Sequence, residues 1–165
     1  MSAGLDEILT AARTRLAAAP REALGELVEP RRVLGIARAP RVVPRGSAWH
    51  LGVLLLTDDA VLATGEIVRA RQEAIRGYTA ESQRRRAELA AAARRGGFPE
   101  GAVVHIRWRM LDPAATGRDA ASDPLAIRDG VPLVRWSAAG GYVPLEPYLD
   151  ERIELLLNPP AGAGI

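Results

Sequence analysis

Hydrophobic residues recur at helical spacing near the start of the chain. In the stretch 5–16 they fall three or four positions apart, so that one face of a helix would be apolar. Residues 21–28, which lie between two prolines, predict a short second helix with a proline near its start. The residues expected on the buried face of the first helix are Leu5, Ile8, Leu9, Ala12 and Leu16.

Two later helices are predicted at residues 80–95 and 146–157. Thr79 stands where its hydroxyl could cap the first of them, and two glycines end it. The buried side of that helix is expected to be small, with Ala87, Leu89, Ala90 and Ala91. The last helix is expected to bury Leu149, Ile153, Leu156 and Leu157.

Between these helices, the apolar residues alternate with polar ones or form short continuous runs, which is typical of strands. Residues 49–56 predict a core strand covered on both faces, and 60–68 predict the returning arm of a hairpin. Residues 102–110 alternate cleanly and predict a strand buried on one face only. Its apolar face would carry Val104, Ile106, Trp108 and Met110, and its other face Val103, His105, Arg107 and Arg109.

A further hairpin is predicted around Asp129 and Gly130, between strands at 125–127 and 131–136. Hairpin-linked strands favour antiparallel pairing. The pattern therefore predicts an α+β fold: a mostly antiparallel sheet or half-open barrel, N-terminal helices, a central arginine-rich helix and a C-terminal helix. A barrel like that of pleckstrin-homology domains is the alternative topology.

The domain organisation follows from length and composition. The chain has 165 residues, of which 48% are hydrophobic and 25% charged, as in an ordinary globular domain. We expect a single α+β domain over residues 1–157. The Pro/Gly/Ala-rich residues 158–165 predict a disordered tail.

Two absences exclude several chemistries. The chain has no cysteine, which excludes disulfides, thiolate nucleophiles and cysteine-based zinc sites. All 22 basic residues are arginine, which excludes a Schiff-base lysine, a serine–lysine dyad and a P-loop lysine. No motif indicates a metal or a cofactor, so none is expected.

No apolar run approaches the roughly 20 residues that a membrane span requires. The first nine residues carry two acids and no basic region, unlike a signal peptide. We therefore expect no membrane partner and a cytoplasmic location.

Charge is segregated along the chain although its net value is only +2. Residues 69–95 carry a net charge of +5, and residues 96–165 a net charge of −3. The basic stretch predicts a surface for an anionic ligand or an acidic partner, with a merely solvated helix as the alternative. The acidic last helix could be attracted to it within one chain or across a homo-oligomer. The candidate binding residues are Arg84, Arg85, Arg86, His105, Arg107 and Arg109.

The two histidines are weak catalytic candidates. His50 lies in the predicted core strand, where a structural hydrogen bond is the alternative role. His105 would lie beside two arginines, which lower the affinity of a histidine for protons and disfavour a metal ion. No serine stands in a nucleophile motif. Catalysis would therefore need a histidine paired with an acid that the sequence does not place.

Residues 27–59, 78–101 and 134–156 together resemble a family of small, uncharacterised actinobacterial proteins. The resemblance covers nearly the whole chain but carries no catalytic motif, so it implies no site residues. Some members of that family are labelled glutaminase. Serine-dependent glutaminases use Ser-x-x-Lys and amidotransferase-type enzymes use a cysteine, and this chain has neither lysine nor cysteine.

Three functional hypotheses follow. The first is a non-catalytic binding or assembly protein that uses the arginine-rich surface. The second is a small amide hydrolase that uses His50 or His105 with an acid. The third is a nucleic-acid binder, which the low net charge and an aromatic content of 4% disfavour.

Overall fold

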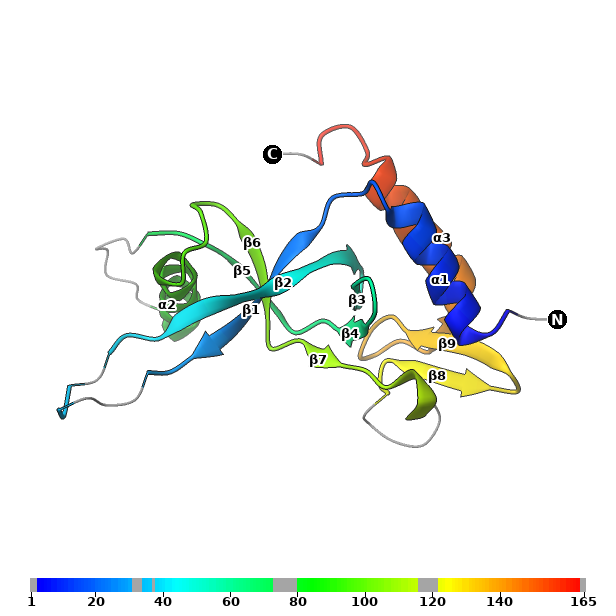
Figure 1. Ribbon diagram of the computed structural model, residues 1–165, viewed down its shortest axis with the longest axis horizontal. Coiled ribbons are helices and arrows are strands. Elements are labelled where there is room, and N and C mark those ends of the chain that lie inside the picture. Colours follow the sequence, from blue (N-terminus) through cyan, green and yellow to red (C-terminus); the bar gives the residue numbers. More distant parts are fainter. Residues whose placement is uncertain (1–2, 31–33, 37, 73–79, 116–121, 164–165) are drawn as a thin grey trace. The chain divides into compact units, whose positions relative to one another are not determined.

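The computed structural model in Figure 1 describes residues 3–30, 34–36, 38–72, 80–115 and 122–163. These residues form three α-helices and ten strands, which confirms the α+β class. The strands β1 to β7 are mostly antiparallel to their neighbours, and β8 to β10 form a second, antiparallel sheet. Within the described residues neither sheet closes into a barrel.

The chain divides into two compact units that interleave along the sequence. The first unit consists of Met1–Arg21, Ala48–Thr64 and Arg109–Ile165, and the second of Glu22–Ser47 and Gly65–Trp108. Each unit has its own cluster of buried hydrophobic residues. Each is therefore described by itself.

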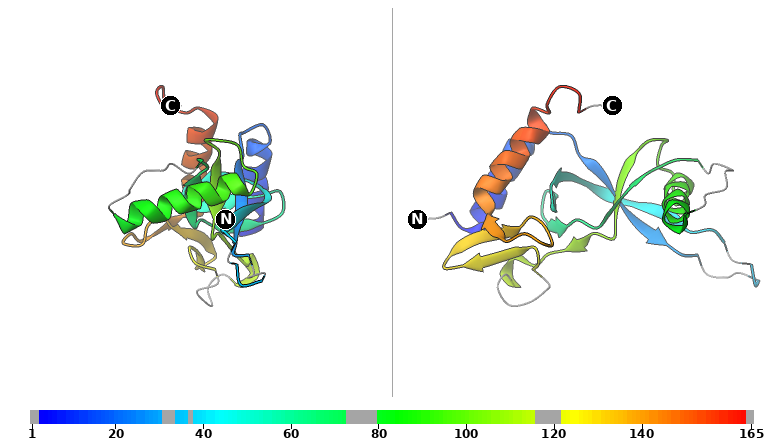
Figure 2. Two further views of the ribbon diagram at one scale, coloured as in Figure 1. Left: turned by 90° about the vertical axis from the view of Figure 1, so that its left-hand side faces the viewer. Right: turned by 180° about the vertical axis from the view of Figure 1, so that it is seen from behind.

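Helix α1 (Leu5–Leu16) matches its prediction in both ends and in all five buried residues. It lies side by side with α3 (Leu145–Leu157) in the first unit, as Figures 1 and 2 show. An ion pair between Arg15 and Asp150 links the exposed sides of the two helices. The amphipathic pattern was a sound guide here because the helix buries one face against its own unit and leaves the other in solvent.

Helix α3 is where predicted but buries an earlier stripe. Its core residues are Leu145, Tyr148, Leu149 and Ile153. The predicted Leu156 is partly buried against the core, whereas Leu157 is exposed, because the last turn of the helix runs past the core.

The predicted core strand at 49–56 is in fact the end of one strand and the whole of the next. The chain reverses at Gly52 and Val53, and Gly52 adopts a φ of +66°, a conformation that favours glycine. The second strand is buried throughout. In the first unit, the last residues of β2 (Arg41–Leu51) pair with β3 (Leu54–Leu56), and β4 (Val61–Ala63) and β7 (Arg109–Met110) follow in that order.

The predicted hairpin at Asp129 and Gly130 is confirmed. Both residues have positive φ, as a two-residue turn matched to strand twist requires. The turn joins β8 (Leu125–Arg128) to β9 (Val131–Arg135), and β10 (Tyr142–Pro144) pairs with the other edge of β9 and leads directly into α3.

In the second unit, residues 21–28 were predicted to be helical, and this was wrong. They form strand β1 (Glu22–Val28), which runs parallel to β6 (Val103–Ile106). Gly25 allows this strand to pack, because a side chain there would overlap those of Val42 and Val104. Pairing with neighbouring strands overrides local helix propensity. The strand order in this unit is β5 (Glu66–Arg69), β6, β1 and the first part of β2, up to Ser47.

Helix α2 (Glu81–Arg95) is seen from the side in the left view of Figure 2. As predicted, it buries mostly small side chains, but these lie further toward its C-terminal half than expected. Ala80 is its N-cap residue, and the predicted cap Thr79 lies outside the described residues. Gly96 ends the helix against Val42, whose carbonyl oxygen occupies the space that a side chain at Gly96 would need. The buried residues of α2 are Leu89, Ala91, Ala92 and Ala93.

The single domain over residues 1–157 and the disordered tail over 158–165 stay predictions. In the tail, the Asn158 amide donates to the Glu154 carboxylate at 2.7 Å, and the last two residues lie outside the described part. None of the helices that the structure describes has the length and apolarity to cross a bilayer.

The Arg21 guanidinium couples folding of the first unit to pH. It lies 3.8 Å from the centroid of the Trp49 ring and donates to the Asp58 carboxylate at 2.6 Å. This hydrogen bond lowers the pKa of Asp58 below its usual value of 3.8. A carboxyl with a depressed folded-state pKa stabilises the fold above its unfolded pKa, and this contribution is lost as the pH falls through the folded pKa.

We therefore expect Asp58→Asn to lower the free energy of unfolding at pH 6, and the difference from the wild type to shrink as the pH falls through the lowered folded-state pKa of Asp58. Urea unfolding at a series of pH values measures it. In an Arg21→Gln background the same Asp58 substitution should have little pH-dependent effect. A difference that is constant with pH would contradict the assignment.

Candidate functional site

A groove of about 530 Å³ opens on the second unit where α2 faces strand β5. Its walls come from β5, from Arg71 and Gln72 shortly after it, and from one side of the helix. The lining includes the polar or charged residues Arg69, Arg71, Gln72, Gln83 and Arg86 and the apolar residue Leu89.

The backbone around the groove is fixed by hydrogen bonds. The Arg71 N–H donates to the Ala90 carbonyl of α2 at 3.2 Å, which ties the segment after β5 to the helix. Ala70 exchanges backbone hydrogen bonds with the turn before β6, donating to Ala102 at 2.9 Å and accepting from Gly101 at 2.7 Å. Because both walls are anchored in this way, the groove is formed before any ligand arrives.

The groove carries an excess of positive charge. Among the described residues, Arg69, Arg71 and Arg86 have no ion-pair or hydrogen-bond partner for their guanidinium groups, and all three are exposed. Glu66, the one lining carboxylate among the residues that the structure describes, is already shared by Arg107 at 2.9 Å and Arg85 at 3.4 Å. The three guanidiniums can therefore meet an incoming anion without first breaking an ion pair to any other described residue.

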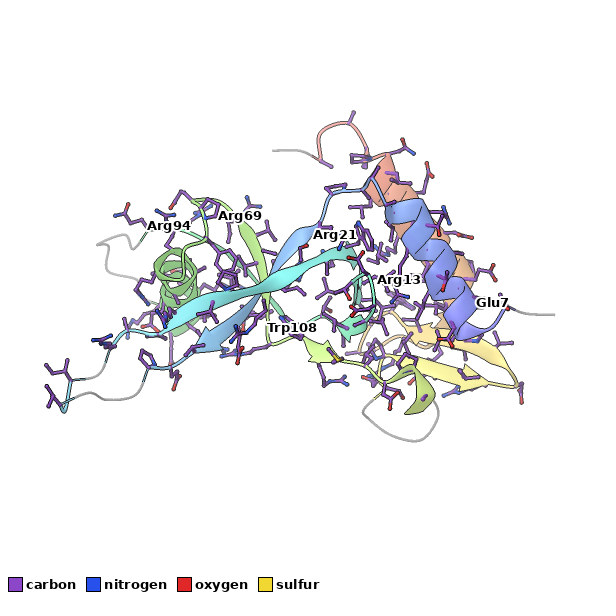
Figure 3. All side chains as sticks on the ribbon, in the orientation of Figure 1. Glu7, Arg13, Arg21, Arg69, Arg94 and Trp108 are labelled. Atoms are coloured by element: carbon purple, nitrogen blue, oxygen red, sulfur yellow. The ribbon has the colours of Figure 1, made fainter. Side chains whose placement is uncertain are left out.

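The predicted triplet Arg84, Arg85 and Arg86 fans around α2, as consecutive helical residues must. Arg86 lines the groove, Arg85 pairs with Glu66, and Arg84 does neither. Arginines at the other end of the helix are used internally. Arg94, labelled with Arg69 in Figure 3, pairs with Glu100 and donates to the Phe98 carbonyl.

The predicted polar strand face of His105, Arg107 and Arg109 does not exist. The strand ends before Arg107, which adopts a φ of +55°, so the alternation stops there. Arg109 belongs to the first unit, where its guanidinium donates to the Asp123 carbonyl at 2.6 Å. The pattern broke because Gly65 lets the Arg107 backbone approach so closely that no side chain would fit there.

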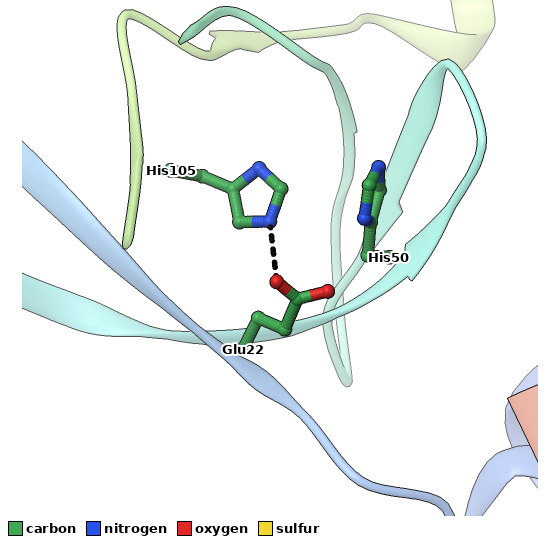
Figure 4. A group of neighbouring side chains, drawn as sticks. All are labelled: Glu22, His50 and His105. Carbon is green, nitrogen blue, oxygen red and sulfur yellow. Dashed lines mark hydrogen bonds and ion pairs between the residues drawn. The ribbon is translucent and has the colours of Figure 1, made fainter. Parts of the chain in front are cut away.

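His105 is fully buried, with 0% of its surface exposed, contrary to its predicted place on a polar face. It pairs with Leu24 of β1 on one side and with Ile67 of β5 on the other. Its Nε2 lies 3.2 Å from the Glu22 carboxylate, as Figure 4 shows. Because the imidazole is closed off from solvent and its Nε2 is held by a carboxylate, this pair suits a structural polar element of the core better than a reactive one.

His50, also labelled in Figure 4, belongs to the first unit. It stands near the end of β2, and its Nε2 lies 3.0 Å from the carbonyl oxygen of Gly52. A ring nitrogen bonded to the turn of its own hairpin corresponds to the structural role that the sequence left open.

Sequence reasoning placed Arg86 in the site but missed the other residues that line the groove with it. Arg69 and Arg71 were inside the basic stretch, so the charge count held a signal for them, while Gln72 and Gln83 gave none. Glu22 was missed because it was assigned to a helix.

Comparison of the chain with protein-family models, with curated proteins and with solved structures finds no match.

A structural role for the buried pair predicts a loss of stability. We expect His105→Ala to lower the free energy of unfolding by about 2–4 kcal/mol, because it removes a buried ring and a hydrogen bond to a carboxylate. Glu22→Gln keeps the size of the side chain and should cost only about 1 kcal/mol. Denaturant unfolding measures both.

Glu26→Gln is the matched control. Glu26 also lies on β1, but its ion pair with Arg45 at 2.5 Å is on the surface, so its loss should cost less than about 1 kcal/mol. If His105→Ala is as stable as this control, the pair does not support the core.

Proposed function

We propose that this chain is a non-catalytic binding or assembly protein whose arginine-rich groove holds an acidic peptide segment. The observation that carries the proposal is the set of three exposed guanidiniums, on Arg69, Arg71 and Arg86, that have no partner among the described residues. Arginine presents a planar fork of donors that matches carboxylate geometry. Three of them around one groove favour a ligand with several carboxylates.

The rest of the groove supports a peptide. Gln72 and Gln83 offer amide groups that can both donate to and accept from a peptide backbone. Leu89, Ala87 and Ala90 supply an apolar floor for side chains. The acidic segment could come from another protein or from the last helix of a second copy, and both sources share this chemistry.

The amide hydrolase is the second candidate, and the Glu22–His105 pair is the observation that favours it. A carboxylate can orient a histidine that acts as a general base. The complete burial of His105 weighs against this role, because a substrate would have to displace core residues to reach the ring.

The groove proposal predicts a selective loss of binding on charge reversal. We expect wild-type protein to bind a fluorescent hexaglutamate peptide at low salt and to show no measurable binding of a hexaglutamine peptide. Arg86→Glu should weaken the binding about tenfold or more, because it replaces an attraction with a repulsion at the contact. Fluorescence anisotropy measures the affinity.

Arg84→Glu is the matched control, since Arg84 lies two residues away on the same exposed helix but does not line the groove. It should change the affinity no more than about threefold through long-range charge, an effect that salt screens. Equal losses for the two variants would show that only the net charge matters. Sedimentation of the wild type and of Arg86→Glu distinguishes a second copy from a foreign partner. Self-association that is lost in Arg86→Glu would identify a second copy of this chain as the ligand, and its absence in the wild type would identify another protein.

Incubation with glutamine separates the binding protein from the hydrolase. We expect folded wild-type protein to release no ammonia above the background of a boiled sample. Release that His105→Ala abolishes would instead establish the hydrolase. Retention on single-stranded or duplex DNA that falls steeply with salt would favour the nucleic-acid binder.

A further inference from the structure

The first unit has a pocket of its own, of about 400 Å³, that the groove proposal does not use. It is formed by the start of α3, by the end of β10 and by the residue that follows β9. A pocket of this size suits a small ligand. Its lining consists of Trp136, Val143, Pro144, Pro147, Tyr148, Glu151 and Arg152.

Tyr148 forms a fixed wall of this pocket. Its hydroxyl donates to the Leu51 carbonyl at 3.0 Å and accepts from the Val53 N–H at 2.9 Å, so it is tied to both sides of the β2–β3 turn. Gly52 at that turn has no side chain, and one placed there would overlap the Tyr148 hydroxyl. The ring is therefore held in one position by the fold.

Arg152 lies one turn further along α3, with its guanidinium carbon 5.3 Å from the centroid of the Tyr148 ring. Its Nε is buried and has no hydrogen-bond partner among the described residues. Nor do those residues supply a carboxylate within ion-pair distance. A half-buried guanidinium without an anion is costly, so its surroundings favour the arrival of one.

In contrast to the charged Arg152, Trp136 provides an apolar surface, a large ring that is 50% exposed. The turn after it packs close to its edge, because a side chain on Gly140 would come within 3.0 Å of the indole ring. With Pro144 and Pro147 nearby, the pocket presents flat apolar surfaces next to one cation. Such surfaces accept an aromatic ring by stacking.

We propose that this pocket binds a small aromatic carboxylate, with the carboxylate on the Arg152 guanidinium and the ring against Trp136. An arginine fork can take both oxygens of a carboxylate. Glu151 also lines the pocket, and its negative charge disfavours multiply charged anions such as phosphates. The pocket thus selects a single negative charge on an apolar body.

The test is calorimetric titration of the full chain with phenylacetate, benzoate and indole-3-acetate, with phenylacetamide as the neutral analogue. We expect saturable binding of at least one acid and much weaker binding of the amide. Arg152→Gln should weaken acid binding roughly ten- to a hundredfold, the effect of losing a charge-assisted hydrogen bond. No saturable binding of any of the three acids by folded wild-type protein would overturn the proposal.

Arg128→Gln is the matched control. Arg128 also lies over a tyrosine, 4.6 Å from the centroid of Tyr142, and belongs to the same unit, but it does not line the pocket. It should bind the acids as the wild type does. If Arg128→Gln and Arg152→Gln lose affinity equally, the proposal is wrong.

Two further variants keep the test decisive if Arg152→Gln does not fold. Glu151→Gln removes, at an exposed position, a negative charge that would repel the carboxylate of the ligand. It should strengthen acid binding a few fold while leaving amide binding unchanged. Trp136→Ala should weaken both. Unchanged acid affinity in both variants would also overturn the assignment.

Discussion

The close approach of helix α2 to the sheet of the second unit is the contact on which the groove depends. Alanines and a terminal glycine make this approach sterically allowed, and Gly96 is required because the Val42 carbonyl fills the space of its missing side chain. Small side chains bury little apolar area, so they contribute little free energy of their own. The helix is instead held at its C-terminal end, where Arg94 and Arg95 donate to the carbonyls of Phe98 and Pro40 at 2.8 and 2.9 Å. The arginines of one helix are thus divided by position: those near its C-terminus fix the helix, and Arg86 remains available for a ligand.

How far the fold could be predicted from the sequence depends on whether the pattern of each element is local. Periodicity found α1, α2 and α3, because each buries a face whose pattern is local in the sequence. It found the hairpin at Asp129 and Gly130, because that turn needs residues that accept positive φ. It failed at residues 21–28, where a strand forms only because β6 and β2 lie on either side of it. Whether a short apolar segment is helix or strand depends there on partners distant in sequence, which a local pattern does not contain.

The sites show the same limit. Charge counting found the basic stretch, but the alternation of residues 102–110 led to a polar face that the positive φ of Arg107 prevents. It also placed His105 on the surface, whereas strands on both sides of β6 bury it next to Glu22. The pocket around Arg152 left no trace in the sequence, because its walls come from separate elements and its tyrosine is fixed by a turn about 95 residues earlier.

The two proposed sites use arginine in opposite ways. In the groove the guanidiniums are exposed, so each contact with an anion is screened by salt and is individually weak, and binding strength has to come from several contacts at once. At Arg152 a single guanidinium is partly withdrawn from water over a tyrosine ring, so screening is less effective and one well-placed carboxylate suffices. The first arrangement discriminates by the number of charges on the ligand. The second discriminates by the shape of the group that carries one charge. A chain that contains no lysine can therefore still offer two different kinds of anion recognition, because the surroundings of each arginine decide which kind it supports.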